Sequence, residues 1–178
     1  LISEYDRLGR SVQVIEPQTF TYDSDAALGN QYIYAGKTTR TNYNAFGDVI
    51  AVSVLKNPIS NTWVITRNYY DKRSHQIATV DALGYLSKQS FDVNGNVIER
   101  TEYATAILAW DAANAQLNLP STTVSNDDRT TRFTYDRLNR KLSETRVNIE
   151  YARPDGSTAK TNVTTSYAYD ALGNLTRS

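Results

Sequence analysis

The side chains that could do acid–base chemistry gather around His75, the only histidine in the chain. Ser74 is its neighbour, and Asp71 and Asp81 lie nearby, so these residue types could make up a serine–histidine–aspartate triad. Successive side chains of a strand point to opposite faces, so Ser74 and His75 are not expected to face each other. The sequence also has no nucleophile-elbow motif. We therefore expect His75 to lie in a surface turn, and we expect no catalytic residue.

Two short acidic segments, Asp23-Ser24-Asp25 and Asn126-Asp127-Asp128, could offer oxygen ligands to calcium. Neither has the full ligand spacing of a calcium loop, so both are expected to be solvated loops. The chain has no cysteine, which excludes thiol catalysis, thiolate metal sites and disulfides. It also has no phosphate-binding glycine loop, metal-ligand cluster or basic stripe. We expect no metal and no cofactor.

The composition bears on whether the chain binds nucleic acid or a membrane. Nineteen basic residues balance nineteen acidic ones, so no general attraction to nucleic acid or anionic lipid is expected. No apolar run approaches the roughly 18 residues that span a bilayer, so this segment is not expected to insert into a membrane. The 178 residues include no methionine and begin at Leu1, and we expect a piece of a longer protein whose signal, if any, lies upstream. The 13 tyrosines suit strands with one wet side.

A short unit recurs along the chain: an aromatic or apolar residue, then Asp or Asn, two variable residues, and Gly or Asn. The residues that define its clear copies are Tyr5, Asp6 and Gly9; Tyr43, Asn44 and Gly47; Asp81 and Gly84; Phe91, Asp92 and Gly95; Tyr135, Asp136 and Asn139; and Tyr169, Asp170 and Gly173. Two looser copies are Tyr22-Asp23, which reaches Gly29 only after extra residues, and Tyr70-Asp71, which has Ser74 where Gly is expected. The repeat predicts one structural device used many times.

The unit has the composition of a tight turn between two strands. The aromatic residue ends one strand, and the Asp side chain accepts backbone N–H bonds from the residues after it. Gly takes the left-handed conformation that closes a hairpin with a bulge. Asn139 fits that position because Asn tolerates positive φ, whereas Ser74 does not, and the turn at Ser74 is expected to differ. The repeated aspartates are therefore predicted to cap turns and not to form a catalytic carboxylate array.

The segments between the turns alternate in the manner of strands. Thr62–Tyr70 places Trp63, Ile65 and Tyr69 on one face, and Arg146–Tyr151 alternates cleanly. Further expected segments are the strands Val49–Lys56 and Thr161–Tyr169 and the turns Asn57–Asn61 and Arg153–Gly156. The prediction is an all-β fold in which antiparallel hairpins form one curved, open sheet over residues 1–178.

One stretch, at about residues 103–130, breaks this pattern. Tyr103–Leu119 is rich in alanine, with Ile107 and Trp110 near helical spacing, and Pro120 would end a helix there. We expect a short inserted helix that packs Ile107 and Trp110 on the sheet, followed by a polar loop. A helix that docks a partner remains the alternative.

The Y-D-x-x-G-[RN]-[LV] signature resembles the YD repeat of Rhs proteins, bacterial wall-associated repeat proteins, the B and C components of insecticidal toxin complexes, and teneurins. In that family the repeats form a β-sheet that spirals into a hollow shell. The resemblance implies a structural segment whose partners are neighbouring repeats and an enclosed C-terminal toxin or effector domain. It also implies a bacterial protein that is secreted or at the cell surface. The Asp-Pro motif of the family's autoproteolytic centre is absent, because Pro154-Asp155 has the reverse order.

Two further expectations follow for a piece of this size. A chain of 178 residues cannot close a shell around a folded protein, so its end strands should carry unpaired backbone groups. An adhesion or carbohydrate-binding module, in which exposed tyrosines contact glycans, is the alternative function. The sequence does not separate sugar-stacking rings from rings that pack on one another.

Overall fold

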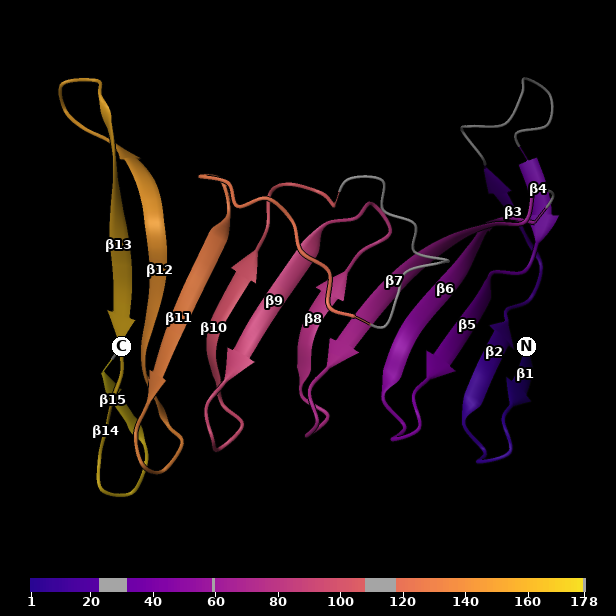
Figure 1. Ribbon diagram of the computed structural model, residues 1–178, viewed down its shortest axis with the longest axis horizontal. Coiled ribbons are helices and arrows are strands. Elements are labelled where there is room, and N and C mark those ends of the chain that lie inside the picture. Colours follow the sequence, from indigo (N-terminus) through magenta and orange to yellow (C-terminus); the bar gives the residue numbers. More distant parts are fainter. Residues whose placement is uncertain (23–31, 59, 108–117, 178) are drawn as a thin grey trace.

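The computed structural model describes residues 1–22, 32–58, 60–107 and 118–177, and these residues form β-strands without any helix (Figure 1). The strands are β1 (Ile2–Tyr5), β2 (Ser11–Ile15), β3 (Thr19–Tyr22), β4 (Tyr32–Ala35), β5 (Thr38–Tyr43), β6 (Val49–Asn57), β7 (Thr62–Tyr70), β8 (Gln76–Val80), β9 (Leu86–Phe91), β10 (Val97–Glu102), β11 (Arg129–Tyr135), β12 (Lys141–Ala152), β13 (Thr158–Ser166), β14 (Ala168–Tyr169) and β15 (Leu175–Arg177). Among these residues there is no helix that could span a membrane.

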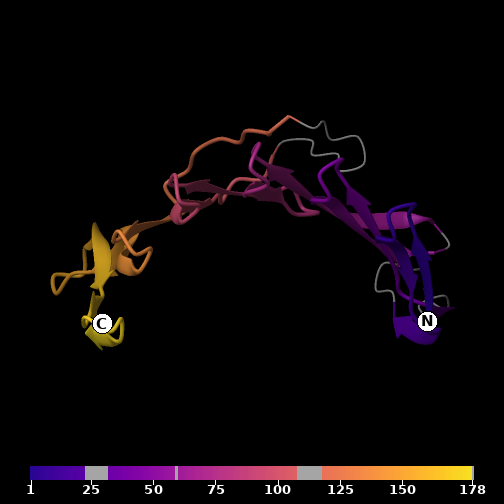
Figure 2. The same cartoon turned by 90° about the horizontal axis from the view of Figure 1, so that it is seen from below.

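Eleven of the strands form one antiparallel sheet in the order β1-β2-β5-β6-β7-β8-β9-β10-β11-β12-β13. Two small hairpins, β3–β4 and β14–β15, lie outside this ladder. Seen from below, the sheet bends into an arch with the two chain ends far apart (Figure 2). The outer strands β1 and β13 each have a single neighbour in the sheet, so it is not closed. The predicted all-β, curved and open antiparallel sheet is confirmed.

The buried core is small and lies on one face of the middle strands. Tyr69, Ala78, Val80 and Leu86 are buried there, and Tyr103 and Ile107 pack against them. Residues 118–128 cross the convex side of the arch (Figure 2). Because side chains alternate along each strand, Val64 of β7 points to the opposite, concave face, as does its partner Val54 of β6. None of the described residues forms a layer over that concave face.

The expected helix is not present in the described part of Tyr103–Leu119. The N–H of Tyr103 bonds to the carbonyl of Leu86 and that of Ile107 to the carbonyl of Gly84, both at 2.9 Å. These N–H groups are thereby used in pairing with the neighbouring strand and its turn, and this pairing outcompetes helical spacing. Ile107 does pack on the core as expected. Residues 108–117, including Trp110, lie outside the described residues.

A carboxylate closes the base of this inserted segment. Asp128 accepts the N–H of Ala104 at its Oδ1 atom and the N–H of Ser125 at its Oδ2 atom, both at 2.9 Å. The hydroxyl of Thr122 donates to the carbonyl of Thr105 at 2.8 Å. These bonds hold the start of the insertion, at Ala104 and Thr105, against its end, at Thr122 and Asp128.

One predicted strand has a bulge. The pairing of β12 with β13 shifts register between Arg146 and Ile149, and Asn148 adopts φ 55°. The N–H of Asn148 bonds to Oδ1 of Asn162 at 3.1 Å. The prediction of clean alternation over Arg146–Tyr151 is therefore wrong, because an Asn that tolerates positive φ allows an extra residue there.

Candidate functional site: a row of linked turns

The polar residues of the repeat lie in a row of turns that join the ends of the strands, along the bottom of the sheet in Figure 1. We call this the turn edge. Its six turns begin at Asp6, Asn44, Asp71, Asp92, Asp136 and Asp170, and each joins neighbouring antiparallel strands. The turn at Asp81 joins β8 to β9 and lies at the opposite edge. We number each turn from its Asp or Asn, so that Asp6 is position 1 and Arg10 is position 5.

Each turn is organised by one side-chain oxygen. In the first turn, Oδ1 of Asp6 accepts the N–H of Leu8 at 2.9 Å and the N–H of Arg10 at 3.0 Å. The same pair of bonds, from positions 3 and 5, recurs in all seven turns at 2.8 to 3.0 Å. One oxygen thereby satisfies two backbone donors that the tight turn would leave unpaired.

Position 4 has positive φ in every turn. Gly occupies it in five turns, with φ from 76° to 96°, and Asn139 adopts 60°. Ser74 adopts φ 61° and its N–H bonds to the carbonyl of Asp71 at 3.1 Å, as the equivalent residue does in the other turns. The expectation that this turn differs is wrong, because the surrounding hydrogen bonds hold Ser in a conformation that it rarely adopts alone.

The second carboxylate oxygen bonds to the side chain at position 5. Arg10 and Arg140 donate through Nε at 2.7 Å, Asn96 and Asn174 donate through Nδ2 at 2.9 Å, and Nδ1 of His75 lies 3.0 Å from Asp71. In the second turn the two roles are exchanged. Nδ2 of Asn44 at position 1 donates to Oδ2 of Asp48 at position 5, at 2.7 Å. The pair therefore needs one donor and one acceptor, in either order.

Hydrogen bonds lower the pKa of five turn carboxylates, those of Asp6, Asp71, Asp92, Asp136 and Asp170. For Asp6 and Asp136 the main cause is the backbone N–H of the position-5 arginine, and for Asp92 and Asp170 it is the position-5 asparagine side chain. At Asp71 desolvation raises the pKa, and bonds from His75 and Arg73 outweigh it. A depressed folded-state pKa stabilises the fold above the unfolded value of about 4, and this stabilisation is lost as the pH falls through the folded pKa.

The aromatic residue before each turn ties one hairpin to the previous one. The hydroxyl of Tyr43 donates to the carbonyl of Ser11, which follows the first turn, at 3.0 Å. Tyr70, Tyr135 and Tyr169 make the equivalent bonds to Val49, Val97 and Lys141 at 2.9 to 3.0 Å. The acceptor is in each case the residue after position 5 of the preceding turn. The repeated tyrosine is thus a connector between hairpins.

Where the aromatic residue is Phe91, another side chain makes this bond. Phe91 has no hydroxyl, and the equivalent acceptor is the carbonyl of Gln76. Nε2 of Gln89, two residues before Phe91, donates to that carbonyl at 2.6 Å. The same acceptor position is therefore used at all five junctions between neighbouring turns.

The turns are also bonded directly to one another. Arg10 donates to the carbonyl of Asn44, Ser74 to the carboxylate of Asp48, Arg73 to the carbonyl of Val93, Asn96 to the amide of Asn139, and Arg140 to the carbonyl of Asp170, at 2.9 to 3.4 Å. Three position-5 side chains also stack on the next aromatic ring: Arg10 on Tyr43, His75 on Phe91, and Arg140 on Tyr169. All six turns are therefore linked in one continuous row.

The structure does not assemble the triad that the residue types suggested. Ser74 Oγ donates to Asp48 at 3.0 Å and not to His75. His75 lies against Asp71 and its ring stacks on Phe91 at 4.6 Å between centroids. Asp81 is at the opposite edge of the sheet. His75 is therefore a turn residue at position 5 of the third turn, as Arg10 is in the first turn and Arg140 in the fifth.

Of the two acidic segments, Asn126-Asp127-Asp128 lies within the described residues, and it forms no cation site there. Asp23-Ser24-Asp25 lies outside them, as does the loose copy that ends at Gly29. In Asn126-Asp127-Asp128, the carboxylate of Asp128 already accepts two backbone N–H groups. Within the described ranges, no group of three or more metal-binding side chains comes together.

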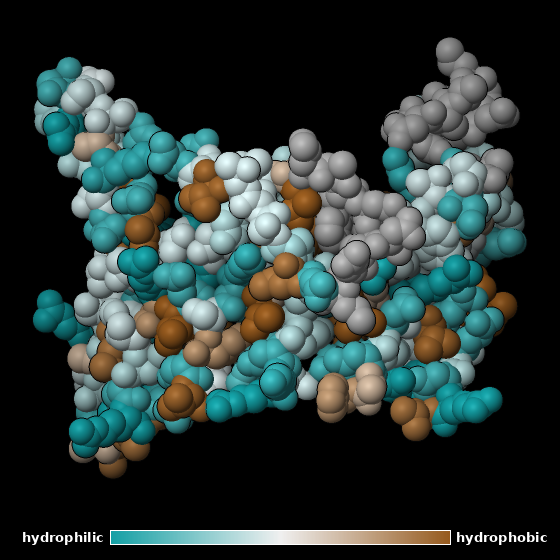
Figure 3. All heavy atoms as spheres, in the orientation of Figure 1, coloured by the Kyte–Doolittle hydropathy of each residue, from teal (hydrophilic) through white to brown (hydrophobic). Residues whose placement is uncertain are grey.

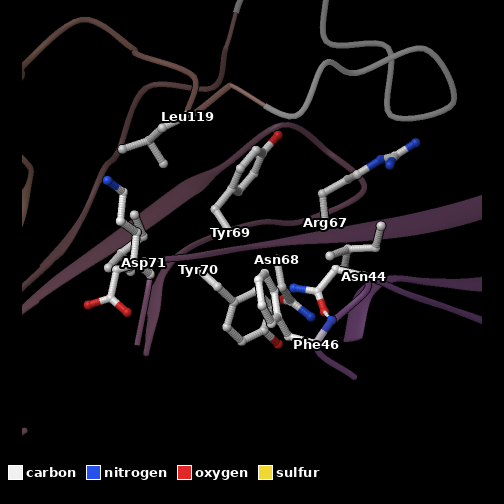
Figure 4. A pocket seen from close by; sticks show the side chains of 11 residues that line it. Asn44, Phe46, Arg67, Asn68, Tyr69, Tyr70, Asp71 and Leu119 are labelled. Atoms are coloured by element: carbon white, nitrogen blue, oxygen red, sulfur yellow. Dashed lines mark hydrogen bonds between the residues drawn. The ribbon is translucent and has the colours of Figure 1, made fainter. Parts of the chain in front are cut away.

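A shallow pocket lies at the turn edge between the second and third turns (Figure 4). Its lining includes Phe46, Tyr69, Asp71 and Leu119, with Tyr69 on the side of Leu119. The Tyr69 hydroxyl is buried and has no hydrogen-bond partner in the described part of the chain. Burial also raises the pKa of Tyr69. This hydroxyl is the exception among the buried side-chain donors of the described residues.

Comparison with known proteins finds similarity only among solved structures. No protein-family model and no curated protein matches the chain. A crystal structure of TcdB2-TccC3 without its hypervariable C-terminal region matches with a TM-score of 0.49 and 14% identity, over 98% of this chain and 9% of that chain. A Tc holotoxin pore of Photorhabdus luminescens matches with a TM-score of 0.39 and 20% identity, over 98% and 8%. The chain spans less than a tenth of the length of these structures, and likeness at this level does not identify a function.

The tyrosine connector can be tested with two matched removals of a hydroxyl group. Tyr135→Phe deletes the bond to Val97 and should lower the free energy of unfolding by about 0.5–1.5 kcal/mol. Tyr69→Phe deletes a buried hydroxyl that has no hydrogen-bond partner among the described residues, and it should leave the free energy of unfolding unchanged or raise it by about 1 kcal/mol. Urea unfolding measures both. Equal losses in the two variants would contradict the assignment of Tyr135 as a connector.

The order of donor and acceptor found in the second turn, Asn44 and then Asp48, can be introduced into the fourth turn by mutation. At neutral pH, Asn96→Asp places two carboxylates side by side and should lower the urea midpoint. Adding Asp92→Asn re-creates the Asn44–Asp48 pair and should restore most of the loss. The measurement is a double-mutant cycle at pH 7. Additive losses in the double variant would show that the two side chains do not interact.

Proposed function

We propose that this chain is a stretch of the wall of a larger YD-repeat β-shell, which encloses or displays a toxin or effector polypeptide. The observation that carries the proposal is the single-layer, arched sheet whose outer strands β1 and β13 each have one neighbour. A strand with one free edge is suited to pairing with a further strand. The resemblance of the turn sequence to the YD repeat gives the same reading.

The linked turns suit such a wall. A single-layer sheet buries few side chains, and among the described residues the buried apolar ones are Ala51, Tyr69, Ala78, Val80 and Leu86. Bonds along the turn edge add rigidity that a thin sheet cannot gain from a core. In this proposal the partners of the chain are neighbouring repeats and the enclosed C-terminal polypeptide. The chain has no catalytic role, cofactor or metal of its own, and it belongs to a secreted or cell-surface bacterial protein.

Protease protection of the intact, longer protein tests the wall. Leu86→Asp places a charge in the buried core and should open the sheet, so that the enclosed polypeptide is cleaved within minutes of adding protease. Val124→Asp changes a side chain that is 77% exposed and should leave the enclosed polypeptide protected, as in the wild type. Cleavage of that polypeptide at one rate in all three proteins would contradict enclosure.

A second candidate function, binding of glycans, is favoured by the hairpin β3–β4. Phe20, Tyr22, Tyr32 and Tyr34 are 56–74% exposed and lie on one face of it, since Phe20 pairs with Tyr34 and Tyr22 with Tyr32. The ring centroids of Phe20 and Tyr34 are 4.8 Å apart, and those of Tyr22 and Tyr32 are 5.6 Å apart. Unlike the connector tyrosines, they form an exposed aromatic surface whose rings offer both an apolar face and a polar tip.

Glycan binding has a localised test on this surface. If the chain binds sugars here, Tyr32→Ala should abolish the signal on a glycan array, and Tyr85→Ala, at a tyrosine that is 44% exposed elsewhere, should keep it. No signal from the wild type, or equal signals from both variants, would remove this candidate. The result does not bear on enclosure, because neither variant touches the core.

A further inference from the structure

Two positions of the repeat vary together along the turn edge. Position 5 is Arg or His in the first, third and fifth turns, and Asp or Asn in the second, fourth and sixth: Arg10, Asp48, His75, Asn96, Arg140 and Asn174. Position 4 of the following turn depends on it. The pairs at the five junctions are Arg10 with Gly47, Asp48 with Ser74, His75 with Gly95, Asn96 with Asn139, and Arg140 with Gly173. Glycine thus follows each long side chain, and Ser or Asn follows each short one.

After a long position-5 side chain, glycine leaves the space that this side chain occupies. A Cβ atom at Gly95 would lie 3.3 Å from Nε2 of His75, which is tighter than ordinary van der Waals contact. At the other two glycines of this kind, a Cβ atom would meet Nη1 of the preceding arginine at 3.9 and 4.0 Å. The imidazole is also held in place, because it lies against Asp71 and stacks on Phe91. A larger residue at position 4 would therefore collide with the turn before it.

After a short position-5 side chain, position 4 has a side chain that bonds to it. Oγ of Ser74 donates to Oδ2 of Asp48 at 3.0 Å, and Nδ2 of Asn96 donates to Oδ1 of Asn139 at 2.9 Å. Glycine at position 4 could make neither bond. Ser74 and Asn139 adopt φ 61° and 60°, a conformation that Gly adopts more easily. The bond to the preceding turn offsets part of this cost, which accounts for the two departures from Gly among the six turns.

The contacts between neighbouring turns are polar at all five junctions. In the space-filling view, hydrophilic side chains lie between the hydrophobic ones along the lower edge of the molecule (Figure 3). A polar group needs a partner of the right kind at short range, so a mismatch costs more than it would between apolar groups. Such contacts are suited to distinguishing one neighbour from another.

We infer that position 5 of one turn and position 4 of the next form a matched pair, which decides which hairpin can lie beside which. A hairpin with Arg or His at position 5 accepts a neighbour with Gly at position 4 and rejects one with Ser or Asn. A hairpin with Asp or Asn at position 5 bonds to Ser or Asn. Because all the hairpins share one turn design, these pairs keep a hairpin from docking beside the wrong neighbour. The inference deepens the proposed function by stating what a neighbouring repeat must carry, and it rests on that function for repeats outside this chain.

A double-mutant cycle at the third junction tests the requirement for space. The effects of Gly95→Ala and His75→Asn should not add, because the shorter asparagine makes room for the new methyl group. The equilibrium constant for urea unfolding should be about fivefold smaller in the double variant than the product of the two single effects predicts. Gly9→Ala is the matched control, since Gly9 has φ 76° and a Cβ atom there would meet nothing within 4 Å. Its effect should add to that of His75→Asn, and equal coupling at the two glycines would overturn the inference.

A second cycle converts the fourth junction into the other kind of pair. Asn96→Arg places a long side chain against Asn139, and Asn139→Gly removes the acceptor of Asn96. Together they create the arginine–glycine pair of the first junction, with Tyr135 in the place of the tyrosine on which Arg10 stacks. The unfolding constant of the double variant should again be about fivefold smaller than the product of the single effects. Additive effects would overturn the inference. Neither cycle involves an enclosed polypeptide, so the inference and the proposed function fail separately.

Discussion

The structure depends on one hydrogen-bonding arrangement, in which a single side-chain oxygen accepts two backbone N–H groups across a five-residue turn. Oδ1 of Asp136 does this for Leu138 and Arg140, and the amide oxygen of Asn44 does the same without a charge. The arrangement fixes where one strand ends and the next begins, so it sets the register of each hairpin. It also directs the second oxygen of Asp, or the amide nitrogen of Asn, toward the side chain at position 5. Several of these position-5 side chains then contact the next hairpin, as Arg140 does.

Coupling between hairpins explains how a thin sheet can hold a defined arch. Each of the five junctions on the turn edge has a bond to the carbonyl after position 5 and a second bond from turn to turn. Among the described residues, the cluster of buried apolar side chains lies in the middle of the sheet, around Val80 and Leu86. Stability is therefore spread along the chain in nearest-neighbour steps, as in other repeat proteins, and each hairpin depends on the ones beside it.

The sequence was sufficient to predict the class of fold, the turns and the roles of Asp and Gly, because these follow from residues four or five apart. The connector role of Tyr43 and Tyr135 was missed, because each bonds to a residue 32 or 38 positions away and the lengths between turns vary. A signal was present in the exchanged residues Asn44 and Asp48, which show that positions 1 and 5 form a pair. The helix was wrongly expected over residues 103–107, since local composition does not reveal that Gly84 and Leu86 offer carbonyls to the N–H groups of Ile107 and Tyr103. The bulge at Asn148 and the turn at Ser74 were likewise decided by neighbouring strands.

Native-state hydrogen exchange of the unmodified chain tests the central arrangement most directly. The amides at turn positions 3 and 5 lie at an exposed edge, yet each is bonded to a side-chain oxygen. Leu138 is the sharpest case, with a side chain that is 72% exposed and an N–H that lies 2.8 Å from Asp136. The account predicts that the amides of Leu138 and Arg140, and those of Arg73 and His75 in the turn with serine, exchange at least about a hundredfold more slowly than in an unfolded chain. Exchange of these amides at the unfolded rate, with slow exchange confined to the strands, would contradict it.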